Sequence, residues 1–169
     1  MFLLNSFIPE VQILLILSKM AGMYWQDKLH EVRAKHDLAE HELRSPFTDW
    51  PAIMKKIEAN FIIKANSNNH FTNWILHLKT ALITQQSDNI ADWKTVLPES
   101  LQYYLVLTGK VASNKHFVFD CSPKALEVLV DAISDSHFYV VDKKYQWMVL
   151  FNRDEAFKRV MGYKLLESK

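Results

Sequence analysis

The chain has 169 residues, 49% of them hydrophobic, which is enough to bury one substantial core in a single domain spanning residues 1–169. Lys and Arg together number 20, Asp and Glu 19, and the formal charge of +1 comes with no block of like charge. Nucleic-acid binders usually carry a basic patch and nucleic-acid mimics an acidic one, so the charge favours neither class. With only 3 Gly and one cysteine, Cys121, the composition argues against phosphate-binding glycine loops and excludes an internal disulfide and cysteine-based zinc sites.

The first residues are apolar but match neither a secretory signal nor a membrane span. No Lys or Arg precedes the apolar run, and Pro9, Glu10 and Gln12 interrupt it. We therefore expect a buried helix that ends at Gly22. A second helix is predicted from Met23 to Arg44, because apolar positions along it alternate by four and three residues, as in helices packed lengthwise on one another: Trp25, Leu29, Val32, His36, Ala39 and Leu43.

The middle of the chain is also predicted to be helical. Thr48 or Asp49 caps a helix with an apolar stripe, and Phe61–Lys64 either extends this helix or forms a short strand. An amphipathic helix is expected from Phe71 to Thr84. After it we expect a loop at Gln85–Asn89, a short helix or turn at Ile90–Val96, and a helix that starts at Leu97-Pro98-Glu99 and runs through Leu107.

The last third contains the predicted strands, at residues 115–120, 137–141 and 146–151. Between the first two, Ser122 and Pro123 start a helix whose Leu126, Leu129, Val130 and Ile133 share one face. Asp142–Tyr145 is predicted to be a tight hairpin turn. A closing helix is expected from Asn152, with Glu155 in a capping box and Gly162 as the C-terminal stop.

These elements predict an α+β fold. Its sheet is small, three-stranded and mainly antiparallel within residues 110–169, and residues 1–109 are mainly helical. The last two strands are apolar on both alternating sides, so the sheet should be covered on both faces. We expect the two C-terminal helices on one face and the N-terminal helices on the other.

No residue pattern identifies a catalytic, cofactor-binding or metal site. His30-Glu31 begins like a zinc-binding helix, but Ala34 stands where the second histidine should be. Asp120 with Asp142 and Lys144 resembles the acidic and lysine set of metal-dependent nucleases, which makes a metal-dependent hydrolase an alternative. Asp142 and Lys144 lie in the predicted turn, however, where such residues occur for conformational reasons. We expect Cys121 to be a small buried residue and not a nucleophile.

The aromatic residues suggest where a partner could bind. Trp25, Trp50, Trp74 and Trp147 occupy apolar positions and are expected in the core, whereas Trp93 should be partly exposed. At least one ring of Tyr103-Tyr104 should lie near the surface. Tyr and Trp are enriched in protein interfaces. The candidate partner-binding residues are therefore Trp93, Tyr103, Tyr104, Lys143 and Lys144.

The run HFYVVDKKYQWMVLFNRDEAFKRVMG resembles the closing hairpin and helix of small bacterial immunity-type proteins, including SUKH-like families, and LPESLQYYLVLTGK is similar to a helix of that group. The SUKH glycine pair is absent, because Gly109 stands alone. The resemblance implies a cytoplasmic, non-enzymatic protein without cofactor that neutralises a cognate toxin by protein-protein occlusion. It carries over no individual site residue.

The implied protein would be a monomer or homodimer that binds neither nucleic acid nor a membrane. A further alternative is a helical regulatory or phage-encoded adaptor that dimerises along the Trp25–Leu43 seam.

Overall fold

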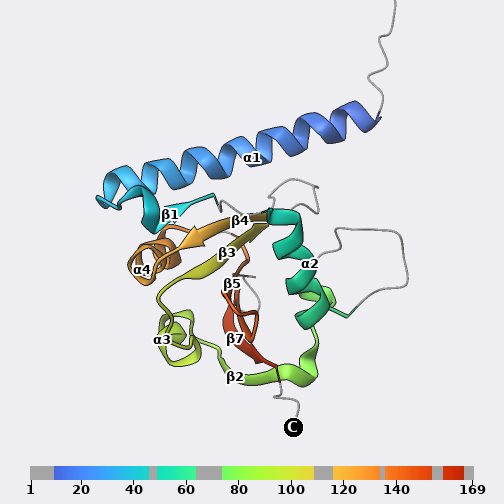
Figure 1. The fold of residues 1–169 in the computed structure, drawn as a ribbon, viewed down its shortest axis with the longest axis vertical. Coiled ribbons are helices and arrows are strands. Elements are labelled where there is room, and N and C mark those ends of the chain that lie inside the picture. The colour runs from blue at the N-terminus through green and yellow to red at the C-terminus, as the bar shows by residue number, and fades with distance from the viewer. Residues whose placement is uncertain are drawn as a thin grey trace, which may run out of the picture.

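Figure 1 shows the computed structural model of the chain, which describes residues 10–45, 49–63, 74–108, 116–133, 136–153 and 158–165. Its central feature is one antiparallel sheet of seven strands in the order β1-β4-β3-β5-β6-β7-β2. The strands are β1 (Leu43–Arg44), β2 (Ile83–Ser87), β3 (Tyr103–Thr108), β4 (His116–Cys121), β5 (Phe138–Asp142), β6 (Trp147–Asn152) and β7 (Arg159–Lys164).

The prediction of a small three-stranded sheet is therefore wrong. The three predicted strands are present as β4, β5 and β6, but the sheet also recruits segments predicted as helix or loop. The clearest case is β3, which was expected to be the end of a helix and instead lies between β4 and β5. Leu105, Val106 and Leu107 are all fully buried, so this strand is apolar on both faces. A strand of that kind has the same continuous apolar run as a buried helix, and periodicity cannot separate the two.

The predicted closing helix is also wrong. Asn152 ends β6, and Gly162, expected to terminate a helix, lies inside β7. Glu155 falls outside the described residues. A Cβ atom on Gly162 would lie only 3.1 Å from Cγ1 of Val96, so the missing side chain lets β7 approach closely to α3, which carries Val96.

The helices are not gathered in the N-terminal half. They are α1 (Glu10–Lys35), α2 (Trp50–Phe61), α3 (Trp93–Val96) and α4 (Pro123–Ala132), joined by short 3₁₀ turns at Glu40–Glu42, Trp74–Leu76, Thr80–Leu82 and Ile90–Asp92. The expected helix from Phe71 to Thr84 is wrong from Trp74 on, and Phe71 lies outside the described residues. Phe61 ends α2 and Ile62 forms a single β-bridge with Leu78, while Lys64 falls outside the described residues.

Helix α1 differs from the two helices expected in its place. It runs through Gly22 without a break and ends at Lys35. Asp37 adopts a left-handed φ of 49°, and the Leu38 N–H donates to the Arg33 carbonyl at 3.0 Å. This is the Schellman arrangement that terminates helices, here with aspartate in the position usually held by glycine. The apolar stripe expected along one helix from Trp25 to Leu43 therefore ends with α1, because Leu43 belongs to β1.

Both faces of the sheet are covered, as predicted, but by a different division of helices. One core joins α1, α3 and α4 to the sheet through residues such as Trp25, Leu29, Val96 and Leu126. The other places α2 and the Trp74–Leu78 segment over Val106, Tyr139 and Leu150. Figure 1 shows α3 and α4 on one side of the strands and α2 on the other. Trp50, expected in the core, is 47% exposed at the start of α2.

The predicted start of α4 at Ser122 and Pro123 is confirmed. Ser122 Oγ accepts a hydrogen bond from the Ala125 N–H at 3.1 Å, and Pro123 occupies the first helical position. Among the described residues, no helix is long and apolar enough to cross a membrane.

The α2 core contains one buried histidine. The His116 ring, at the start of β4, stacks on Trp74 with ring centroids 4.1 Å apart, and neither ring nitrogen has a hydrogen-bond partner. Burial lowers the pKa of His116 from 6.5 to about 4, because the charged imidazolium would lose its hydration. The ring is therefore neutral in the folded protein at pH 7.

We predict that this histidine makes the fold sensitive to mild acid. Above pH 6.5 the ring is neutral in both states and costs nothing. Between pH 6.5 and 4 the unfolded chain binds a proton that the folded chain does not, so the free energy of unfolding falls by about 3 kcal/mol. Urea titrations at several pH values should show this fall in the wild type and in the exposed control His36→Gln, but much less of it in His116→Phe. An equal pH dependence in all three proteins would contradict the assignment.

We also predict that Gly162→Val destabilises the protein by about 2 kcal/mol, because the new side chain overlaps Val96. Adding Val96→Ala should make room for it, so the double variant should be more stable than the sum of the two single losses predicts. A double-mutant cycle measured by urea unfolding gives this coupling energy. Strict additivity would mean that the two residues do not compete for space.

Candidate functional site

Four of the five predicted partner-binding residues, Tyr103, Tyr104, Lys143 and Lys144, lie at one end of the sheet, whereas the ring of Trp93 on α3 lies near Phe151, toward the other end of β6. At the first of these ends β3 begins, β4 and β5 end and β6 begins, with Tyr103 paired to both Cys121 and Asp142. The turn of residues 143–146 projects from the same end and carries Lys143 and Lys144. Sequence analysis thus selected four residues that are near one another in the fold, although it expected Tyr103 and Tyr104 on a helix.

These residues nevertheless belong to two different faces. Neighbouring residues on a strand point to opposite sides of a sheet. Tyr103 packs in the core beneath α3 and α4, whereas Tyr104 is half-buried on the side of α2. The expectation that one of the two rings lies near the surface is met by Tyr104. Two surfaces must therefore be considered separately.

The first surface is a groove of about 570 Å³ between α3 and α4. Its apolar lining comes from Trp93, Leu97, Leu101, Tyr103 and Leu126. Leu101 is 93% exposed, the most exposed large hydrophobic residue in the described part of the chain. Trp93 is half-buried, as predicted, with its ring centroid 6.3 Å from that of Phe151 in the core beneath it.

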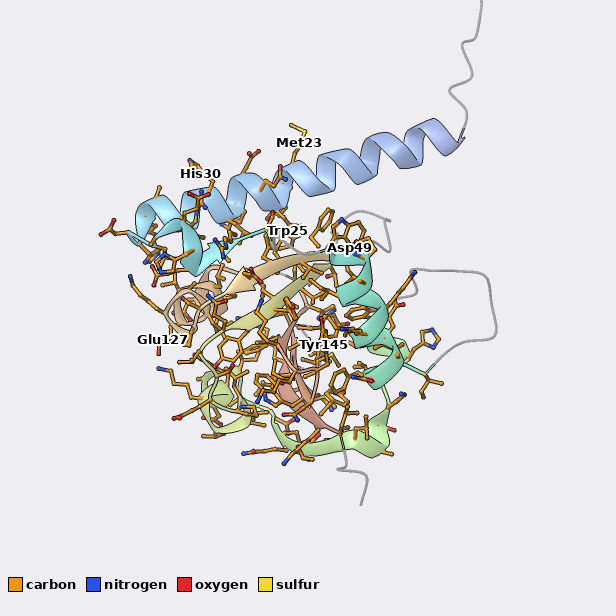
Figure 2. The ribbon with its side chains drawn as sticks, in the orientation of Figure 1. Met23, Trp25, His30, Asp49, Glu127 and Tyr145 are labelled. Atoms are coloured by element: carbon orange, nitrogen blue, oxygen red, sulfur yellow. The ribbon has the colours of Figure 1, made fainter. Side chains whose placement is uncertain are left out.

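The rim of the groove is charged, and acids outnumber bases there, because its lining includes Lys94, Glu99 and Glu127. Lys94 on α3 pairs with Glu127 on α4, with 2.6 Å between Nζ and Oε1, and Lys94 Nζ also lies 5.4 Å from the Trp93 ring centroid. Glu127 is labelled at the outer surface of α4 in Figure 2. An apolar floor with a polar rim is the usual anatomy of a protein interface.

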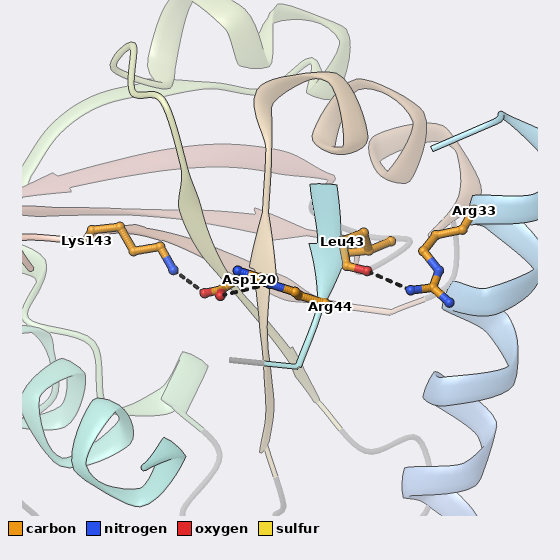
Figure 3. A network of polar contacts seen from close by, with 5 residues as sticks. All are labelled: Arg33, Leu43, Arg44, Asp120 and Lys143. Carbon is orange, nitrogen blue, oxygen red and sulfur yellow. Dashed lines mark hydrogen bonds and ion pairs between the residues drawn. The ribbon is translucent and has the colours of Figure 1, made fainter. Parts of the chain in front are cut away.

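The second surface lies on the side of α2. Arg44, Asp120 and Tyr104 stand side by side on β1, β4 and β3, because register pairs Arg44 with Asp120 and Asp120 with Tyr104. The Lys143 ammonium donates a hydrogen bond to Oδ1 of Asp120, and Arg44 Nε lies 3.8 Å from Oδ2 (Figure 3). Lys143 Nζ also sits 3.6 Å from the centroid of the Tyr104 ring, within range of a cation–π interaction.

Tyr145 and α2 extend this arrangement. The Tyr145 ring lies 5.6 Å from that of Tyr104, and Lys56 Nζ lies 5.2 Å from the Tyr145 ring centroid. Asn60 Nδ2 donates to the Tyr145 carbonyl at 3.1 Å, which ties the turn to α2. Burial and the neighbouring Tyr104 hydroxyl raise the pKa of Tyr145. We call this set the lysine–tyrosine cluster; it consists of Arg44, Lys56, Tyr104, Asp120, Lys143 and Tyr145.

Asp142 organises the turn itself. Its carboxylate accepts hydrogen bonds from the backbone N–H groups of Lys144 at 3.1 Å, Gln146 at 2.6 Å and Trp147 at 3.0 Å. This is the conformational role that aspartate often has in turns.

The residues of the hydrolase alternative do not converge. Asp142 pairs with Tyr103 and Asp120 with Tyr104, so the two carboxylates point to opposite faces of the sheet. Lys143, and not Lys144, reaches Asp120. Within the described ranges, no group of three or more His, Cys, Asp or Glu side chains could hold a metal ion. Cys121 is fully buried, and burial raises the pKa of its thiol, so it is the small core residue that the sequence predicted.

Four residues of these two surfaces are not among the predicted partner-binding residues: Leu101, Arg44, Lys56 and Tyr145. Leu101 was counted within an expected helix, and no pattern indicated that it would face solvent. Arg44 and Lys56 are remote from the turn in sequence, and only the pairing of β1 with β4 and the packing of α2 bring them near it. The one available signal was Tyr145 itself, which follows the charged turn residues.

We predict that Asp142→Ala lowers the free energy of unfolding by about 3 kcal/mol, because it leaves three N–H groups without their acceptor at a largely buried position. Asp142→Asn should lose roughly half as much, since one oxygen remains to accept. Lys144→Ala, on the exposed neighbour, serves as the matched control and should be close to neutral. Urea unfolding measures all three, and a stable Asp142→Ala would show that the turn does not depend on the carboxylate.

Comparison with known proteins gives one match. No curated protein matches the chain, and no solved structure matches it. A family model described as "Family of unknown function (DUF6756)" matches residues 25–167. The match starts at Trp25, a buried residue of α1, and includes all seven strands, the groove and the lysine–tyrosine cluster. The chain therefore belongs to the DUF6756 family.

Proposed function

We propose that this protein is a non-enzymatic, immunity-type inhibitor of the bacterial cytoplasm that binds a cognate toxin or effector and neutralises it by covering part of its surface. The observation that carries this proposal is the groove between α3 and α4 with Leu101 at its edge. A leucine exposed to 93% forgoes about 1.5 to 3 kcal/mol of burial free energy, which a partner could recover. The similarity of the β5–β6 hairpin segment to immunity-type proteins points the same way, although the two helices included in that resemblance are strands β3 and β7 here.

The chemistry of the groove favours binding over catalysis. Its only hydroxyl besides that of Tyr103 belongs to Ser100, which donates to the Gln102 carbonyl at 2.9 Å instead of to a base. Lys94 and Glu127 neutralise each other, and burial raises the pKa of Tyr103, so that phenol stays protonated at pH 7. A nucleophile activated by an adjacent base would need an arrangement that these lining residues do not make.

The adaptor alternative loses its expected dimer contact. Trp25, Leu29 and Val32 of the proposed seam are buried against the sheet and α4 of the same chain. Because these side chains are buried in the core of their own chain, they cannot form a dimer contact with a second molecule. The inhibitor proposal requires no such contact and is compatible with a monomer or a homodimer.

We predict that Leu101→Glu weakens partner binding at least about tenfold without unfolding the protein. Tagged full-length wild type should capture one protein from a lysate of the native host, and expression of that protein alone should arrest growth. Co-expression of the wild type should restore growth, whereas Leu101→Glu should bind the captured protein at least about tenfold more weakly and should fail to restore growth. The control is Met23→Glu on α1, where an apolar side chain that is 53% exposed is changed in the same way away from the groove.

Two results would contradict the proposal. One is a captured protein that is not toxic, or no specific capture at all. The other is full protection by Leu101→Glu, which would remove the groove from the interface. The thermal midpoint of Leu101→Glu should match that of the wild type, because the side chain is nearly fully exposed.

A further inference from the structure

We propose that the lysine–tyrosine cluster, together with its exposed chain neighbours Lys55 and Lys144, is a docking site for an acidic segment of the partner protein. This inference rests on the proposed function, since it describes the chemistry of that partner. The groove lies on the other face of the sheet, so the cluster is a second and separate contact region.

Cations outnumber carboxylates in the cluster. Arg44, Lys56 and Lys143 belong to it, and Lys55 and Lys144 are exposed next to Lys56 and Lys143 in the chain. The one carboxylate inside the cluster is Asp120, which already contacts both Lys143 and Arg44.

Two other acids on the turn and on α2 are engaged elsewhere. Asp142 accepts its three backbone hydrogen bonds on the opposite face of the sheet, and Glu58 of α2 accepts a hydrogen bond from Trp74 Nε1 at 3.3 Å. Positive charge is therefore concentrated locally, although the whole chain carries only +1. A carboxylate-rich segment is the complementary ligand.

The cations are also held in place before any ligand arrives. Lys143 Nζ is fixed between Asp120 and the Tyr104 ring, and Lys56 Nζ lies over Tyr145. Tyr145 is held in turn by Asn60 and adopts a left-handed φ of 58°. A lysine that is already positioned loses less side-chain entropy when it binds an anion than a freely rotating one does. A solvated face of unconnected lysines would lack this feature.

A protein segment fits the cluster better than a nucleic acid does. Proteins that bind single strands offer aromatic faces on which bases stack. Here Lys143 lies over the Tyr104 ring, Lys56 lies over the Tyr145 ring, and the two rings pack on each other. The few cations present also make too small a patch to hold a phosphate backbone against physiological salt.

The test is an NMR titration of the ¹⁵N-labelled full chain with a short polyglutamate peptide. We expect saturable shifts of the backbone amides of Lys143, Lys144, Tyr145 and Lys56 that weaken as salt is raised. Lys56→Glu/Lys144→Glu should weaken binding at least about tenfold, because the charge reversals turn attraction into repulsion. Lys56→Arg/Lys144→Arg should retain it. Neither lysine contacts Asp120 through its side chain, so the fold should tolerate these changes.

The matched control is Lys35→Glu/Lys158→Glu, which changes the net charge equally at two exposed lysines outside the cluster. Equal loss of binding in this control, or no saturable shift in the wild type, would overturn the inference. Tighter binding of an oligothymidylate of the same length would overturn it in favour of nucleic acid.

The result separates the two proposals. Leu101→Glu should leave polyglutamate binding unchanged, because Leu101 is not part of the cluster. Failure of the peptide to bind leaves toxin capture through the groove standing. If the peptide binds but no toxic partner is captured, the cluster is an acidic-peptide site and the inhibitor function fails.

Discussion

Burial of the sheet on both faces is the constraint on which the rest of the molecule depends. The middle of β3, Leu105 to Leu107, has no exposed side chain, because α1, α3 and α4 cover one face and α2 covers the other. A sheet enclosed in this way cannot bind a partner through its broad faces. Recognition must occur at its ends and edges or on the covering helices. Both candidate surfaces are found where strands end, and neither requires the core to open.

The direction of two aspartates explains why one end of the sheet carries two different surfaces. The Asp142 side chain points toward the α3–α4 side, and its carboxylate accepts hydrogen bonds from three backbone N–H groups at the turn. Asp120 turns toward the α2 side and holds Lys143 and Arg44. Alternation along neighbouring strands thus separates a nearly neutral apolar groove from a positively charged cluster. The same alternation separates Tyr103 from Tyr104.

The sequence was informative where local chemistry decides the structure. Ser122 and Pro123 predicted the start of α4, and the charged Asp142–Tyr145 segment predicted a turn. Asp49, one of two residues expected to cap α2, occupies the N-cap position, but its side chain makes no capping hydrogen bond. Prediction from the sequence failed where tertiary packing decides. β3 is apolar at successive positions and carries no periodicity. Gly162 does not end a helix but lies in β7, where it approaches Val96 closely. The candidate site shows the same limit. Lys143 and Tyr104 could be predicted as binding residues from the sequence, but their proximity to Arg44 and Lys56 depends on strand order and helix packing.

The two surfaces suit different parts of one recognition event. A chain with a net charge of +1 exerts little long-range attraction on a partner, and screening at physiological salt limits exposed charges to about 8 Å. The lysine–tyrosine cluster can therefore act only once a partner is near, where it fixes orientation and discriminates against partners that lack acidic residues. The groove, with Leu101 and Trp93 at an apolar surface, is where burial supplies affinity. A partner that uses both must reach around the end of the sheet past the 143–146 turn, so the rigidity that Asp142 gives to that turn sets the geometry of both contacts.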